Sequence, residues 1–168
     1  MMGRLPGALL GAALLLAACG GENPPAPEAS TIEDLERTGQ LPALDRSEDL
    51  LGPDLDGNGV RDDIDAWIAR EEENPARRAA LAQLARAFRA ALLTGGDPAA
   101  AQDAARRQTR AVACVMARSR SPAEGSHAVS DMRKMSANTK QRVQAYLAYS
   151  AALDGAVMSL PAGDGCDD

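Results

Sequence analysis

Polar residues followed by proline divide the second half of the chain into segments of helical length. Two such pairs are Asn74-Pro75 and Asp97-Pro98. An Asn or Asp side chain accepts hydrogen bonds from the unpaired N–H groups of a first helical turn, and proline suits the next position because it has no N–H to leave unbonded. After the first pair, apolar residues recur at helical spacing, and they are Leu81, Leu84, Phe88 and Leu92. The pairs therefore predict one helix over 76–93 and a second over 98–119.

Helical spacing extends through most of the remaining sequence. Helices are predicted at 31–37, at 62–73, in a short segment around 129–135, and from Asn138-Thr139 onward. Ser121-Pro122 and Gly125 are interpreted as a loop. No stretch alternates between apolar and polar residues over the length of a strand. We therefore predict an all-α fold, an irregular bundle of about four or five helices with short connections.

The first 18 residues have the three parts of an export signal. Arg4 supplies the positive charge, residues 5–16 are apolar, and Ala17-Ala18 are the small residues that precede a cleavage site. The apolar run is too short to span a bilayer as a mature helix. Residues 1–18 are therefore predicted to be a leader that is removed.

The four residues Leu16-Ala17-Ala18-Cys19 resemble the lipobox of bacterial lipoproteins. The resemblance implies that Cys19 receives diacylglycerol, that the chain is cut before it, and that the acyl chains, palmitate among them, hold the protein to a membrane. Gly20 follows where the inner-membrane retention signal has aspartate, which implies the outer membrane rather than the inner. The alternative is an ordinary secretory leader that happens to contain a cysteine. Residues 19–30 are rich in proline and are predicted to be a disordered tether before a helical domain over 31–168.

An acidic stretch of twelve residues, 54–65, has a spacing that indicates metal binding. Oxygen-bearing side chains stand at its first, third, fifth, ninth and twelfth positions, and glycine is sixth. Ca²⁺ takes about six to eight oxygen ligands, and a loop of this length supplies them at alternate positions, with a backbone carbonyl at the seventh. The predicted ligands are Asp54, Asp56, Asn58, the carbonyl of Val60, Asp62 and Asp65. The alternative is a turn whose aspartates only cap the next helix.

This spacing resembles the EF-hand loop, and its final aspartate is closer to the loops of dockerins and thrombospondin type 3 repeats. Arg61 stands where an EF-hand usually has an aliphatic residue, and residues 50–53 do not predict an entering helix. The dockerin resemblance implies a protein partner in the envelope or outside the cell, although dockerins carry two such loops and this sequence has one.

Two segments also resemble uncharacterised lipoproteins of Gram-negative bacteria. They are Asn-Gly-Val-Arg-Asp-Asp-Ile at 58–64 and Asn-Thr-Lys-x-Arg-Val-x-Ala-Tyr at 138–146. The resemblance implies that the acidic loop and the last helix belong to one domain. It implies no activity.

The cysteines and the scarcity of histidine bear on stability and on catalysis. With Cys19 lipidated, Cys114 and Cys166 remain as an even pair, and a disulfide between them is the simplest expectation for an exported protein. Two separate thiols are the alternative.

His127 is the only histidine, no His/Cys cluster suits zinc, and no glycine-rich turn suits phosphate. The sequence therefore predicts a protein that is not an enzyme.

The charge of the chain is negative, at −6, which argues against nucleic acid as a partner. Arg106, Arg107 and Arg110 are clustered on the polar side of a predicted helix, where a solvated face is a simpler interpretation than a phosphate site.

We expect a lipid-anchored, non-catalytic structural or interaction module with one calcium loop. A dockerin-like module for a protein partner and a hydrolase with an unrecognised site are the alternatives.

Overall fold

The computed structural model describes residues 31–167, and the predicted leader, Cys19 and the tether lie outside the described residues. The all-α prediction is confirmed: the described part contains six helices, rather than four or five, and no strand. They are α1 (Ile32–Arg37), α2 (Asp62–Glu71), α3 (Pro75–Leu92), α4 (Pro98–Ala117), α5 (Pro122–Ser136) and α6 (Lys140–Ala152). None of these helices is both long enough and apolar enough to cross a membrane.

Capping side chains set the start of the longer helices. Asn74 Oδ1 accepts a hydrogen bond from the N–H of Ala76 at 2.9 Å, and Asp97 Oδ1 accepts one from Ala100 at 2.7 Å. Thr139 caps α6 by the same kind of bond, from the N–H of Arg142 at 3.3 Å. The helix starts predicted from the proline pairs are therefore confirmed.

The start of α5 was predicted wrongly. Ser121-Pro122 is a third pair of capping residue and proline, and the Ser121 hydroxyl accepts a hydrogen bond from the N–H of Glu124 at 3.2 Å. Gly125, interpreted as part of a loop, lies inside the helix and is buried. A Cβ at this position would stand 2.5 Å from Met116 Sδ, so the packing requires glycine. Glycine at this position lets α5 approach the end of α4 closely.

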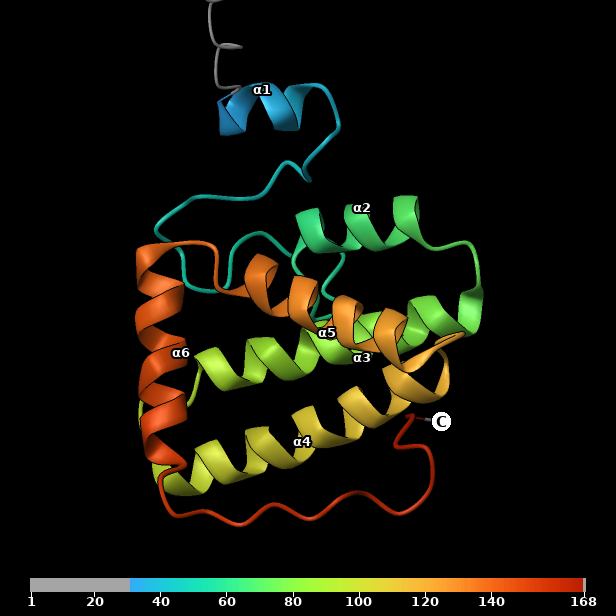
Figure 1. Ribbon diagram of the computed structural model, residues 1–168. Coiled ribbons are helices and arrows are strands. Elements are labelled where there is room, and N and C mark those ends of the chain that lie inside the picture. Colours follow the sequence, from blue (N-terminus) through green and yellow to red (C-terminus); the bar gives the residue numbers. More distant parts are fainter. Residues whose placement is uncertain (1–30, 168) are drawn as a thin grey trace, which may run out of the picture. The chain divides into compact units, whose positions relative to one another are not determined.

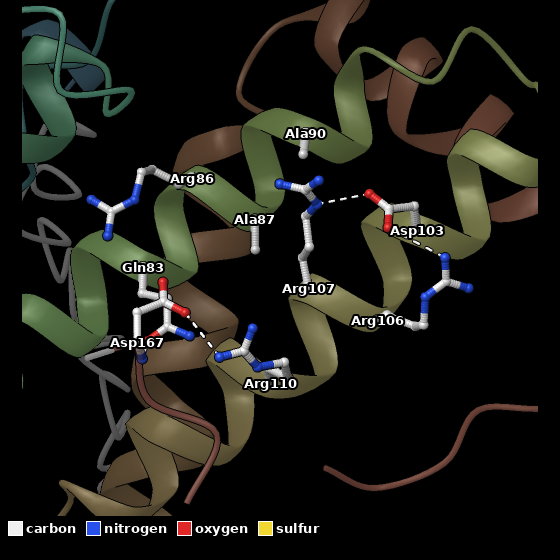
Figure 2. Close-up of a pocket in the computed structure, with 9 residues that line it drawn as sticks. All are labelled: Gln83, Arg86, Ala87, Ala90, Asp103, Arg106, Arg107, Arg110 and Asp167. Carbon is white, nitrogen blue, oxygen red and sulfur yellow. Dashed lines mark hydrogen bonds and ion pairs between the residues drawn. The ribbon is translucent and has the colours of Figure 1, made fainter.

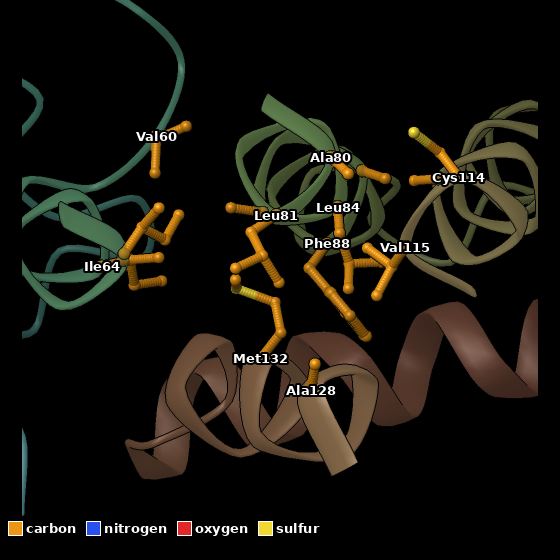
Figure 3. Packing of buried hydrophobic residues seen from close by; sticks show 14 of the residues in the cluster. Val60, Ile64, Ala80, Leu81, Leu84, Phe88, Cys114, Val115, Ala128 and Met132 are labelled. Atoms are coloured by element: carbon orange, nitrogen blue, oxygen red, sulfur yellow. The ribbon is translucent and has the colours of Figure 1, made fainter. Parts of the chain in front are cut away.

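The core is built around α3, which packs against α2, α4, α5 and α6. Figure 1 shows α3 and α4 side by side, with α5 crossing α3 and α6 standing across one end of both. Side chains of several helices meet beside α3 (Figure 3), and Leu84, Phe88, Val115 and Met132 are almost completely buried there. Much of the contact between α3 and α4 is made by buried alanines, which let the two helices lie close together.

A disulfide joins Cys114 of α4 to Cys166 near the end of the chain, which is the pairing predicted from the sequence. The two Cα atoms are 4.7 Å apart. After α6 the described part of the chain contains no further helix and runs back along α4 to reach this bridge (Figure 1). The disulfide therefore attaches a long irregular segment to the helical body.

Candidate metal site

The acidic loop 54–65 leads from an irregular segment into α2, and its own side chains hold its turns. Asp56 Oδ1 accepts a hydrogen bond from the N–H of Asn58 at 3.1 Å, and Asn58 Oδ1 accepts one from Val60 at 2.7 Å. Gly59 has a φ of +83°, where a side chain would be strained, and its N–H donates to Asp54 Oδ2 at 3.2 Å. The loop therefore winds so that alternate side chains face its inside.

This winding brings three of the predicted ligands together. Asp54, Asp56 and Asp62 each offer a carboxylate oxygen, and the three oxygens lie within 4.8 Å of one another. Such a group could hold a metal ion. All three residues belong to the loop itself.

The other predicted ligands lie around this group. Asp65 lies outside it and is connected to it by Asn58, whose amide nitrogen donates to Asp65 Oδ2 and, at 2.8 Å, to Asp56 Oδ2. If the Asn58 amide turned over to offer its oxygen to a metal on that side, it would give up these two bonds and the one that its oxygen accepts from the N–H of Val60. The side chain of Val60 is buried in the core, which fixes the backbone whose carbonyl was the predicted ligand.

One carboxylate oxygen of Asp54 is buried without a hydrogen-bond partner among the described residues. Its side chain is 12% exposed, and its Oδ2 forms an ion pair with Arg89 Nη1 of α3 at 3.3 Å. Its Oδ1 is buried and has no hydrogen-bond partner in the described part of the chain. A carboxylate oxygen that is removed from water without a partner costs free energy, and a cation bound beside it would remove that cost. The donor set therefore fits a cation.

Arg61, at the position where an EF-hand has an aliphatic residue, is buried and links the loop to α5. It donates from Nε and Nη2 to both oxygens of Asp63, at 2.6 and 2.8 Å. It also donates to the carbonyl of Met135 at 3.0 Å and to Asn138 Oδ1 at 3.4 Å. Arg61, the residue that departs from the EF-hand pattern, thus makes structural contacts in this protein.

A second arginine, Arg142 of α6, is completely buried and holds the segment before the loop. Its guanidinium donates to Asp45 Oδ2 at 2.6 Å, to the carbonyls of Asp45, Asp49 and Leu50 at 2.7, 2.7 and 3.1 Å, and to Asn138 Oδ1 at 2.9 Å. Burial raises the pKa of Asp45, but the hydrogen bonds from Arg142 and Ser47 outweigh it, so that the pKa lies below its ordinary value.

Asn138 connects the two arginines. Its side-chain oxygen accepts from Arg61 and Arg142, and its nitrogen donates to the carbonyl of Asp45 at 2.9 Å. The segments 58–64 and 138–146 therefore meet in one buried polar network, as expected for parts of one domain. Asp45 and Arg142 were not among the residues predicted to form the site. One signal was present: Arg142 lies four residues before Tyr146 and seven before Tyr149, the spacing of residues on one face of a helix.

Comparisons with protein-family models, with curated proteins and with solved structures found no match to this chain. The function is therefore inferred from the residues of the site.

Proposed function

We propose that this protein is a lipid-anchored, non-catalytic module of the bacterial envelope, at the outer rather than the inner membrane, whose loop 54–65 binds one Ca²⁺. The observation that carries the proposal is the group of three carboxylate oxygens within 4.8 Å of one another. The buried Oδ1 of Asp54 supports it, because that oxygen has no hydrogen-bond partner within residues 31–167.

Calcium suits this donor set better than other common metals. The available ligands are carboxylates, one amide oxygen and one backbone carbonyl, which are hard oxygen donors. Zinc favours sulfur and nitrogen ligands, and the loop contains neither cysteine nor histidine. Magnesium requires a tight octahedral shell, whereas the irregular loop suits the more flexible shell of calcium. We assign the ligands to Asp54, Asp56, Asn58, the Val60 carbonyl, Asp62 and Asp65.

The bound ion would join the irregular segment to the first long helix. Asp54 and Asp56 precede α2, whereas Asp62 and Asp65 belong to its first turn. Arg61 and Arg142 already attach the neighbouring backbone to α5 and α6. Calcium would complete this attachment on the side of α2, which gives the ion a structural role and requires no catalysis.

Calorimetric titration of the unlipidated chain beginning at residue 20 is expected to show one Ca²⁺ bound with a Kd of about 10⁻⁴ M. Asp54→Ala and Asp65→Ala should abolish the heat, because each removes a charged ligand. Arg89→Met should tighten binding, since the Arg89 guanidinium competes with the ion for Asp54. At ten times the Kd, calcium should add about 1.4 kcal/mol to the free energy of unfolding, and magnesium should add less.

Glu73→Gln is the matched control for these titrations. Glu73 is an exposed acid just beyond α2 and outside the loop, so its removal should leave the calcium affinity unchanged. Equal heats from the unsubstituted chain and from both aspartate variants would contradict the calcium proposal. The aspartates would then serve only to form the turn and begin α2.

The lipid anchor is tested by Cys19→Ala. Because the thiol is the proposed acceptor of diacylglycerol, this substitution should shift the protein from the detergent-soluble membrane fraction to the soluble fraction, or leave it unprocessed. Palmitate labelling followed by fractionation measures the change. Labelling that persists in the variant would contradict the assignment of the anchor to Cys19.

A further inference from the structure

A groove of about 560 Å³ lies between α3 and α4, beside residues 103–110 of α4, and arginines dominate its lining. Figure 2 shows Arg86 on α3 and Arg106, Arg107 and Arg110 on α4 around it. Two carboxylates, Asp103 of α4 and Asp167 of the C-terminal segment, also line it. The small side chains of two alanines leave room between the helices.

The two carboxylates neutralise only part of this positive charge. Arg106 and Arg107 share one partner, Asp103, at 3.3 and 2.8 Å. Arg110 pairs with Asp167 at 3.1 Å. Arg86 forms no ion pair or hydrogen bond within residues 31–167. The groove thus has a surplus of positive charge in a chain whose net charge is −6.

Most of the hydrogen-bond donors in the groove are free to bind a ligand. Each guanidinium has five N–H groups, and the ion pairs of the groove use few of them. Arg106, Arg107 and Arg110 are between half and two thirds exposed, so a ligand can reach them. Arginine matches the oxygens of a phosphate group with two parallel hydrogen bonds, which lysine cannot do. All four cations of the groove are arginines.

One wall of the groove is held in place by bonds that have no connection with the metal site. The buried Gln83 accepts a hydrogen bond from the N–H of Asp167 at 3.1 Å and donates one to the carbonyl of Gly165 at 2.9 Å. Between these two residues, Cys166 is bonded to Cys114. The C-terminal segment is therefore fixed against α3 and α4 where it closes the groove, and a ligand meets a preformed site.

We propose that this groove binds an anion carrying at least two phosphate groups, either a free polyphosphate or a phosphorylated sugar headgroup. One phosphate contacts Arg86 from α3, and the other contacts Arg107 and Arg110 from α4. From the sequence, Arg106, Arg107 and Arg110 were interpreted as a solvated face. The position of Arg86 on the neighbouring helix and the fixed C-terminal segment favour an anion site instead. The aliphatic part of the Arg86 side chain lies beside Gly59 of the acidic loop, but the proposed phosphate contacts do not require bound calcium.

Titration of the full chain in nonionic detergent with tripolyphosphate and with fructose 1,6-bisphosphate tests the proposal. At least one of the two ligands should bind, and increasing salt should weaken the interaction because the charges are exposed. The double variant Arg86→Gln, Arg107→Gln should bind about tenfold more weakly or worse. Tighter binding of tripolyphosphate identifies the ligand as free polyphosphate, and tighter binding of the sugar bisphosphate identifies a headgroup.

Arg78→Gln is the control, because Arg78 is an exposed arginine of α3 that does not line the groove. It should bind both ligands as the unsubstituted chain does, and thermal unfolding should show that all variants are folded. The proposal is overturned if neither ligand binds at millimolar concentration, if the control loses affinity as much as the double variant, or if an oligonucleotide binds more tightly than both ligands.

Discussion

Replacing Arg142 with methionine is expected to lower the free energy of unfolding by about 3–5 kcal/mol, although no proposed ligand is touched. The variant leaves the largely buried carboxylate of Asp45 without its cation, and three backbone carbonyls lose their hydrogen bonds. Methionine fills much of the same volume, so the loss should come from the unpaired polar groups and less from a cavity. The expected fall in melting temperature is about 10 °C.

Denaturant unfolding of the unlipidated chain measures this effect, with two matched variants. Arg133→Met removes an exposed arginine of α5 and should change the free energy of unfolding by less than about 0.5 kcal/mol. Arg142→Lys keeps the charge but not the planar fork, so it should fall between the unsubstituted chain and the methionine variant. A loss in Arg142→Met no larger than in Arg133→Met would show that the buried network does not stabilise the fold.

The dependence of stability on pH separates this ion pair from simple packing. The pKa of Asp45 lies below its ordinary value of 3.8 in the folded protein. The pair therefore contributes its full stabilisation above that ordinary value and loses it as the pH falls through the folded-state pKa. Arg142→Met lacks the cation, so its stability should fall less steeply over the same acidic range.

Loss of the disulfide is the second large expected effect. Cys114 and Cys166 are 52 residues apart, and opening a loop of that length gives the unfolded chain entropy worth about 4 kcal/mol in the loop-closure model. The double variant Cys114→Ala, Cys166→Ala should therefore unfold about 10 °C lower than the unsubstituted chain. Because the bridge holds the segment after α6, hydrogen exchange should accelerate there before the helices open.

Reduction of the unsubstituted chain provides the comparison for this variant. It opens the same bridge without creating a cavity at the buried Cys114, so agreement between the two melting temperatures assigns the effect to the crosslink. A melting temperature that does not respond to reduction would mean that the bridge does not contribute to stability.

Local features of the sequence determined the helices and the course of the acidic loop. The pairs Asn74-Pro75 and Asp97-Pro98 predicted two helix starts, because capping is a contact between residues close together in the chain. The spacing of Asp54, Asp56 and Asp62 predicted their approach for the same reason. The disulfide followed from the count of cysteines. The prediction failed at Gly125, where packing of α5 on α4 outweighs the usual tendency of glycine to end a helix.

Contacts between distant residues were decided by the tertiary structure alone. Arg142 and Asp45 are 97 residues apart, and although the spacing of Arg142 to Tyr146 is a local signal of burial, nothing in either local sequence identifies Asp45 as its partner. The groove likewise requires Arg86 of α3 to lie across from arginines of α4, which depends on how the two helices pack. Burial and long-range pairing depend on the arrangement of whole helices. That arrangement determines which charged side chains are removed from solvent and which residues become their partners. Short-range spacing determined the elements of this protein, and helix packing decided which of its charged residues are structural and which are free to bind.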